Sequence, residues 1–231
     1  MNHPIEVRDV SKTFGLSPVL RGVTLKVAQG EGAIVVGHNG SGKSTLVRIL
    51  AGLSPASSGE AMLFGQPARQ LQARDRERVG LITHQSFLYP RLTARENLEF
   101  YAELYRLGRP AISISDLLER IGLAPVADQR VCTFSRGMEQ RLMLARATIA
   151  APDVLLMDEP FAALDSDGVE LAMSIIEEAL GRGSAIVMTA HQAFQLRRLT
   201  FTSYALLRGR LYPALSDSKT EEAAERSAAA G

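Results

Sequence analysis

A glycine-rich run lies near the start of the chain: Gly37-His38-Asn39-Gly40-Ser41-Gly42-Lys43-Ser44-Thr45. It fits the P-loop pattern GxxxxGK[ST] in full, follows an apolar run typical of a strand, and opens a helical pattern, as that motif requires. Glycines let the backbone wrap around phosphate, while successive N–H groups supply positive potential. We expect Lys43 to reach the β- and γ-phosphates of a bound nucleotide and Ser44 to ligate Mg²⁺. The alternative is a glycine-rich turn that matches by chance.

A second run, Val154–Met157, ends in the adjacent carboxylates Asp158 and Glu159. In a parallel sheet, ligands sit at the carboxyl ends of the strands, so these acids should face the P-loop. We expect Asp158 to hold Mg²⁺ and Glu159 to orient and deprotonate an attacking water. Taken alone, the pair would be read as two solvated loop acids; beside a P-loop it indicates hydrolysis.

The pattern of the chain predicts an α/β fold. Five short apolar runs are typical of buried strands, and helical patterns lie between them, which indicates a mostly parallel sheet covered on both faces. The strands are expected at Ala33–Val36, Val79–Thr83, Val154–Met157, Ala185–Thr189 and Tyr204–Leu207. The first thirty residues instead alternate short strands with turns, so a small N-terminal antiparallel sheet is expected.

Helices dominate the middle of the chain. Residues from about Leu92 to Ala145 contain no convincing strand, and we interpret them as a helical lobe inserted into the core. Thr93 and Glu96 form a capping box at its first helix, which Gly108 is expected to stop. A second helix follows Ser135. A third should run from Gly168 to Leu180, with Gly181 as its C-cap.

Composition restricts the class of protein further. Lys and Arg number 26 against 25 Asp and Glu, so no basic surface for nucleic acid is indicated. No apolar run approaches the roughly 18 residues of a membrane span, and the first ten residues lack a signal-peptide layout. The single Cys132 suits a reducing compartment. A role at a membrane would therefore require a partner protein. The tail at 216–231 is rich in Ala, Ser and Glu and is expected to be disordered.

A third motif narrows the identification. The octapeptide Phe134-Ser135-Arg136-Gly137-Met138-Glu139-Gln140-Arg141 resembles the LSGGQ signature of ABC ATPases, at the start of a helix and shortly before the acidic strand. The resemblance extends from about Ile5 to Leu211. The match is imperfect, since Phe134, Arg136 and Met138 replace the usual Leu, Gly and Gln. Ser135 and Gly137 are retained, and a Ser-capped helix N-terminus is a suitable anion site. Arg136 either adds charge near the phosphate or faces solvent.

The resemblance implies roles for further residues. Gln85 matches the glutamine that contacts Mg²⁺ and water, His191 the histidine near the γ-phosphate, Asp165 the interface aspartate, and Phe14 the aromatic that stacks on adenine. It implies ATP and Mg²⁺ as cofactors. It also implies a dimer, expected to be a homodimer, in which each ATP lies between the P-loop of one chain and Ser135 and Gly137 of the other. Residues 1–215 would form one ABC ATPase domain, peripheral to the cytoplasmic face of the inner membrane and bound to an integral membrane transporter subunit.

One more segment gives an indication of the transported substrate. The run His84-Gln85-Ser86-Phe87-Leu88-Tyr89-Pro90-Arg91-Leu92-Thr93, followed by Glu96-Asn97-Leu98-Glu99-Phe100-Tyr101, resembles the ATPase subunit of the haem exporter of bacterial cytochrome c maturation. Its exposed aromatics either receive a coupling helix of the membrane subunit or pack the lobe. Related signatures also occur in exporters of drugs, lipids and polysaccharides. A soluble ABC ATPase of ribosomes or DNA, and a regulator that binds ATP without hydrolysis, are the other classes.

Overall fold

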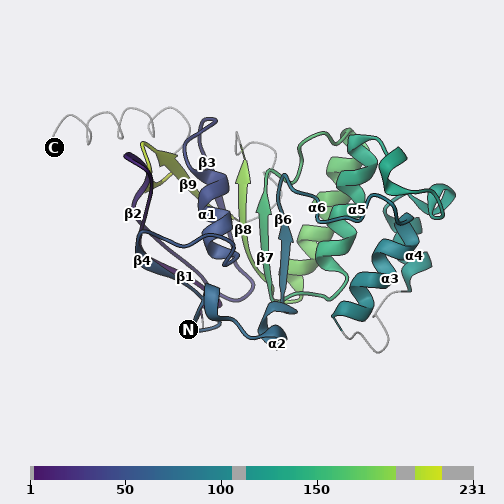
Figure 1. Ribbon diagram of the computed structural model, residues 1–231, viewed down its shortest axis with the longest axis horizontal. Helices are drawn as coiled ribbons and strands as arrows, with labels where there is room; N and C mark the ends of the chain where they lie inside the picture. Colours follow the sequence, from purple (N-terminus) through teal and green to yellow (C-terminus); the bar gives the residue numbers. More distant parts are fainter. Residues whose placement is uncertain (1–2, 106–112, 191–200, 215–231) are drawn as a thin grey trace.

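Two β-sheets form the frame of the molecule. The computed structural model describes residues 3–105, 113–190 and 201–214. The larger sheet has the order β10-β9-β3-β8-β7-β6 (Figure 1). All its neighbouring strands are parallel except β9 and β10, which confirms the mostly parallel sheet. Its strands are β3 (Gly32–Val36), β6 (Val79–Ile82), β7 (Val154–Asp158), β8 (Ala185–Ala190), β9 (Phe201–Leu207) and β10 (Arg210–Pro213).

The smaller sheet is antiparallel, as predicted for the N-terminal segment. Its order is β2-β1-β4-β5. The expectation of short strands was wrong, because β1 (Ile5–Phe14) and β2 (Ser17–Val27) have 10 and 11 residues. Register shifts interrupt their ladder, so the long pair can twist while keeping its apolar side chains on the core. The sheet is completed by β4 (Ser58–Leu63) and β5 (Gln66–Pro67).

Helices cover both faces of the larger sheet, and alternation along its strands explains how. On β3, Ala33 and Val35 belong to the core with α1 and the antiparallel sheet, whereas Ile34 belongs to the core with α5 and α6. Figure 1 shows α1 between the two sheets and the lobe helices α3 and α4 at the far end. The helices are α1 (Lys43–Leu50), α2 (Ala73–Arg76), α3 (Ala94–Leu104), α4 (Ile114–Arg120), α5 (Arg136–Thr148) and α6 (Ser166–Gly181).

The predicted helical lobe is present. Between Leu92 and Ala145 the described residues form α3, α4, short 3₁₀ turns and most of α5, and no strand. The capping box at the start of α3 is confirmed: Thr93 accepts a hydrogen bond from the Glu96 backbone, and the Glu96 side chain accepts one from the Thr93 backbone. Gly108, the predicted stop, lies outside the described residues, and α3 ends at Leu104.

The ends of α6 differ from the prediction. The helix begins at Ser166 rather than Gly168, because the Asp165 side chain caps it through the backbone N–H of Gly168. Gly181 is its last residue rather than its C-cap, and Arg182 is the cap. Gly183 takes the left-handed conformation, with φ of 94°, that ends the helix. In the part of the chain that the structure describes, no helix is long and apolar enough to cross a membrane.

Candidate functional site

The P-loop turns between β3 and α1, as its sequence predicts. Gly40 and Gly42 hold φ values of 78° and 107°, in the left-handed region that glycine adopts without strain. Lys43 is the first residue of α1, and its side chain is 5% exposed. Its Nζ donates to the carbonyl oxygens of Gly37 at 2.7 Å and His38 at 3.2 Å. The Lys43 ammonium group is therefore held against the backbone of the P-loop, which fixes the position of its charge.

The two acids at the end of β7 face different partners. Asp158 is the last residue of the strand and is 3% exposed, and its Oδ1 accepts a hydrogen bond of 2.6 Å from Thr189 Oγ1 on β8. Glu159 adopts φ of 53°, a left-handed conformation that is strained for a residue with a side chain. Its N–H donates to the Thr189 carbonyl and hydroxyl oxygens. Thr189 thus fixes both residues, a role that the sequence did not suggest.

A pocket of about 550 Å³ lies over the P-loop. It joins the glycine-rich loop to Glu159, whose Oε1 lies 3.4 Å from Lys43 Nζ. Its size suits a small organic ligand, and the helix N-terminus and the lysine favour an anionic one. The lining residues are Val19, Asn39, Gly40, Gly42, Lys43, Ser44, Thr45, His84 and Glu159.

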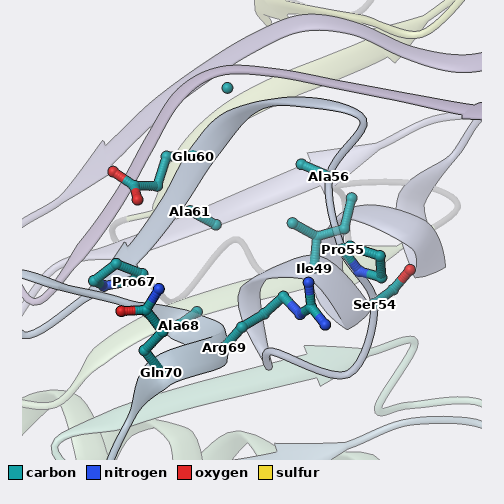
Figure 2. A pocket seen from close by; sticks show the side chains of 11 residues that line it. Ile49, Ser54, Pro55, Ala56, Glu60, Ala61, Pro67, Ala68, Arg69 and Gln70 are labelled. Carbon is teal, nitrogen blue, oxygen red and sulfur yellow. The ribbon is translucent and has the colours of Figure 1, made fainter.

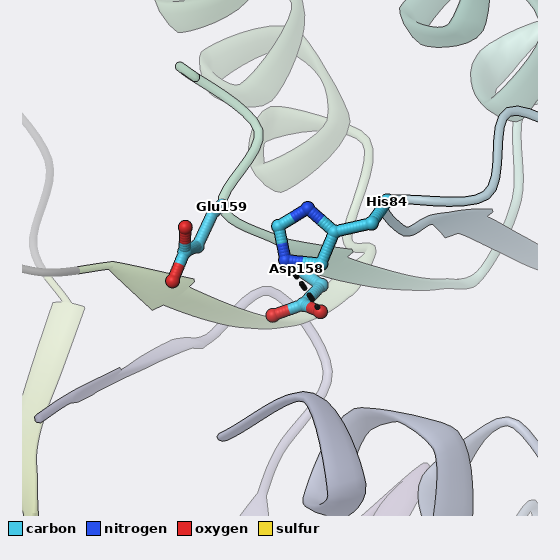
Figure 3. A group of neighbouring side chains, drawn as sticks. All are labelled: His84, Asp158 and Glu159. Carbon is cyan, nitrogen blue, oxygen red and sulfur yellow. Dashed lines mark ion pairs between the residues drawn. The ribbon is translucent and has the colours of Figure 1, made fainter. Parts of the chain in front are cut away.

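His84 lines this pocket, although its sequence motif gave it no role there. Its Nε2 lies 3.6 Å from Asp158 Oδ2, and Figure 3 shows the imidazole beside that carboxylate with Glu159 on the other side. The predicted Gln85 is exposed on the following loop and does not line the pocket. The signal for His84 was its position two residues after the end of β6, whose carboxyl end meets those of its neighbours.

The residues of the third motif lie elsewhere in the chain. Ser135 caps α5 by accepting a hydrogen bond from the backbone N–H of Met138, and it is exposed. Arg136 is also exposed, which fits the solvent-facing alternative. At Gly137 the backbone of α5 approaches the loop before α6, since an added Cβ would lie 3.2 Å from the Ala163 carbonyl oxygen. None of these residues lines the pocket over the P-loop.

Asp165 links this motif to α6. Its Oδ1 accepts bonds from the Gly168 N–H at 2.8 Å and from Arg141 at 2.7 Å. The hydrogen bond from Gly168, followed by that from Arg141, lowers the pKa of the Asp165 carboxyl. Gln140 adds a bond of 2.8 Å to the Pro160 carbonyl oxygen. The segment from Pro160 to Asp165 is therefore held against α5 within one chain.

Two further predicted residues complete the account. Phe14 stands at the tip of the β1–β2 hairpin, 54% exposed, with Lys12 Nζ 4.8 Å from its ring centroid. It is therefore not a core residue, and it lies on the hairpin whose Val19 lines the pocket. His191 lies outside the described residues, as does the tail at 216–231.

A second pocket, of about 360 Å³, lies on the opposite end of α1 (Figure 2). Its walls come from the end of α1, β4 and the turn after β5. They share no residue with the pocket over the P-loop. The candidate site is therefore the P-loop pocket, where the charged groups converge.

Comparison with known proteins agrees with this geometry. A family profile described as ABC transporter matches residues 20–162, well over half of the chain. The chain belongs to the ABC transporter family. The match begins in β2, and it contains the P-loop, the signature motif and both acids of β7.

Relatives of this ABC protein include two kinds of exporter subunit. It is 36% identical over 197 residues to Nod factor export ATP-binding protein I of Rhizobium meliloti, covering 84% of this chain and 59% of the relative. It is 34% identical over 200 residues to cytochrome c biogenesis ATP-binding export protein CcmA of Sodalis glossinidius, covering 87% of this chain and 92% of the relative. The chain thus spans about three fifths of the first relative's length.

A solved structure extends the comparison to the whole fold. This ABC protein superposes with a TM-score of 0.78 and 26% identity on an ATP-binding cassette whose dimer was solved in a post-hydrolysis state with ADP and phosphate. The match covers 92% of this chain and 100% of that one. The predicted fold class, an antiparallel N-terminal sheet, a mostly parallel main sheet and a helical lobe, is confirmed.

Proposed function

We propose that this chain hydrolyses ATP as the nucleotide-binding subunit of an ABC exporter. The observation that carries the proposal is the 3.4 Å contact between Lys43 and Glu159, which joins the P-loop and the acidic strand end in one pocket. Phosphoryl transfer to water needs positioning and charge stabilisation more than covalent chemistry. Lys43 and the backbone N–H groups of the loop would hold the β- and γ-phosphates. Glu159 would accept the proton of the attacking water.

The donor atoms near the P-loop fit Mg²⁺. Ser44 contributes a hydroxyl oxygen and Asp158 a carboxylate whose orientation Thr189 fixes, and oxygen donors are what Mg²⁺ prefers. Gln85 belongs to this set on the resemblance alone, since it is exposed and does not line the pocket. When bound, Mg²⁺ supplies charge neutralisation to the phosphate oxygens. The protein's part is to fix Asp158 and Ser44 in advance.

The family resemblance implies a site shared between two chains, so we propose a dimer, in its simplest form a homodimer. Ser135 and Gly137 would approach the phosphate held by a second chain's P-loop, and Asp165 would cross the interface. Support comes from the exposed cap at Ser135 and from the dimeric state of the superposed cassette. His191 near the γ-phosphate, Phe14 on adenine and a domain boundary at residue 215 belong to the same proposal.

ATP hydrolysis would be coupled to the membrane subunit through an aromatic surface of the helical lobe. Tyr89 is 46% exposed, and its ring packs edge-on against Phe100 at 4.7 Å, so it both packs the lobe and reaches solvent. A half-exposed aromatic set on a rigid base suits a protein interface. An integral membrane subunit would dock here, and this chain would lie peripherally on the cytoplasmic face of the inner membrane. The balanced charge of the chain favours this partner over a nucleic acid.

Haem is the substrate class that we propose for the exporter. Support comes from the run His84–Tyr101 and from the relative named for cytochrome c biogenesis, of which this chain covers 92%. The Nod factor relatives have similar identity but are longer than the matched region. Deletion of the gene should abolish covalent haem in c-type cytochromes, measured by haem staining of periplasmic and membrane fractions. Normal staining would direct the proposal to a lipid-like, polysaccharide or drug substrate instead.

Phosphate release from ATP by the purified chain tests the hydrolysis. Glu159→Gln should lower the turnover about 10²-fold or more, because a positioned general base contributes at least that much. It should also trap an ATP-bound dimer, measured by size-exclusion chromatography with ATP. The matched control is Glu177→Gln, an exposed acid on α6, which should keep the wild-type rate. Undiminished hydrolysis in Glu159→Gln would remove Glu159 as the base. A wild-type chain that binds ATP but releases no phosphate would instead be a regulator.

A further inference from the structure

His84, Asp158 and Glu159 place one imidazole nitrogen and two carboxylates together at the edge of the phosphate pocket (Figure 3). One ligand atom from each residue lies within 4.8 Å of those of the other two. The proposed hydrolysis uses the two acids but gives His84 no task. We propose that the three residues form a binding site for a borderline divalent transition metal, such as Zn²⁺ or Co²⁺, in the nucleotide-free chain.

The donor set selects the class of metal. Imidazole nitrogen suits Zn²⁺, Co²⁺ and Ni²⁺, whereas Mg²⁺ strongly prefers oxygen. One histidine and two carboxylates are ligands that Zn²⁺ accepts, and three protein ligands leave a fourth position open to water. His84 is therefore the residue that separates this site from the proposed Mg²⁺ site. The metal site shares Asp158 with that site but needs no phosphate oxygens.

The surroundings orient the ligands. Thr189 Oγ1 holds Asp158 Oδ1 at 2.6 Å, which leaves Oδ2 directed toward His84 Nε2, 3.6 Å away. A hydrogen bond to the second oxygen of a carboxylate ligand is the usual way in which proteins orient it for a metal. The Asp158 side chain is 2% exposed and fixed, whereas the His84 side chain is 63% exposed. His84 can therefore close on the metal while the acid stays in place.

Lys43 is a described cation whose charge opposes a metal ion at this site. Its Nζ lies 3.4 Å from Glu159 Oε1, yet it also donates to the carbonyl oxygens of Gly37 and His38. Those two bonds keep the ammonium group satisfied when a metal takes Glu159. Among the described residues, Asp158 and Glu159 bring two carboxylates to the site and Lys43 brings one ammonium group, and a dication is favoured where carboxylates converge. A metal there would occupy two acids that the nucleotide complex also needs, so we expect the two to compete.

Metal titration of the untagged, nucleotide-free chain tests the site. Zn²⁺ affinity is measured by isothermal titration calorimetry, and Co²⁺ is followed by its visible absorption. Wild type should bind one metal ion per chain. His84→Ala should weaken Zn²⁺ binding at least about tenfold, since even outer partners of a metal ligand affect affinity that much. His3→Ala, which removes a histidine outside the cluster, should bind as wild type does, and Mg²⁺ affinity should not depend on His84.

Two results would overturn the site: no metal binding by wild type, or equal Zn²⁺ affinity in wild type and His84→Ala. Asp158→Asn provides a second variant, and it should also weaken Zn²⁺ binding if the site is as described. Circular dichroism checks that each variant is folded. The inference uses two residues of the proposed function but does not need ATP. Loss of phosphate release with intact metal binding would count against the function alone, and the reverse result against the metal site alone.

Discussion

Glu159 combines a strained backbone with a charge at the centre of the pocket. Its φ of 53° lies in a region that residues with a side chain rarely adopt, and the bonds from its N–H to Thr189 hold it there. The two neighbouring acids have different partners: Asp158 lies beside His84 (Figure 3), and Glu159 Oε1 lies 3.4 Å from Lys43 Nζ. Two neighbouring residues thereby serve different parts of one site.

Arg146 on α5 is a second residue whose position needs a reason. It is 4% exposed, it donates to the Leu81 carbonyl oxygen, and its guanidinium lies 5.3 Å from the centroid of the Tyr101 ring and 5.8 Å from that of Phe87. Burial lowers the pKa of the guanidinium. Tyr101 in turn donates to the Phe87 carbonyl oxygen. The arginine therefore ties the end of β6, the loop after it and the lobe into one packed unit.

Replacing Arg146 should destabilise the fold. Arg146→Met should lower the free energy of unfolding by about 1–3 kcal/mol, because the Leu81 carbonyl oxygen loses its buried donor. Urea unfolding followed by circular dichroism measures the change. Arg136→Met, an exposed arginine on the same helix, is the control and should stay within about 0.5 kcal/mol of wild type. Equal stability of the two variants would show that the buried cation contributes nothing.

The contact between β6 and α5 depends on a glycine without positive φ. A Cβ added at Gly80 would lie 2.3 Å from the Ala147 carbonyl oxygen and 2.8 Å from Leu155 Cδ1. Helix and strand backbones can approach this closely only where no side chain intervenes. The close approach also sets the distance between α5, which carries the signature motif, and β6, which precedes His84.

Gly80→Ala should therefore lower the free energy of unfolding by about 1–3 kcal/mol, as overpacking in a core does. Gly181→Ala is the matched control, because nothing lies within 4 Å of the added Cβ and the site is helical. That control should be neutral or more stable by up to about 1 kcal/mol, since alanine favours helix more than glycine does. The prediction is wrong if thermal and urea unfolding show Gly80→Ala to be as stable as its control.

The sequence predicted the elements well where one signal dominated. The five strands of the larger sheet follow from apolar runs, and the start of α3 follows from a capping box. The sequence pattern did not predict β10 (Arg210–Pro213). This short strand forms by pairing with β9, and its own residues carry no strand signal. The start of α6 was placed two residues late because Asp165 was read as an interface residue alone, while it also caps the helix.

The candidate site was partly predictable for a similar reason. Sequence motifs with a known local structure predicted three residues of the site, and all three line one pocket: Lys43, Ser44 and Glu159. Thr189 and His84 depend on which strands are neighbours in the sheet, which composition and spacing do not show. Asp158 pairs in register with Thr189 across β7 and β8, so their contact appears only once the strand order is known.

At the scale of the whole molecule, the proposed dimer assigns the signature motif and the P-loop of one chain to different sites. Ser135→Arg should abolish ATP hydrolysis but leave nucleotide binding by the monomer intact, since Ser135 does not line the chain's own pocket. Ser113→Arg is the matched control, because Ser113 is also an exposed N-cap, accepting from the Asp116 N–H at 3.1 Å. Each variant loses about 1 kcal/mol of capping. Fluorescent-nucleotide binding and phosphate release separate the effects. Hydrolysis lost equally in both, or in neither, would contradict the assignment.

Mixing two inactive variants tests the composite site most directly. Lys43→Ala removes the phosphate-binding charge and Ser135→Arg blocks the motif that acts on the other chain, so each alone should release almost no phosphate. In a mixed dimer one site carries both defects and the other carries neither. An equal mixture should therefore regain up to about one quarter of the wild-type rate if chains pair at random. A mixture no more active than its two components would show that no site is shared between chains, and the account of a two-chain ATPase would fail.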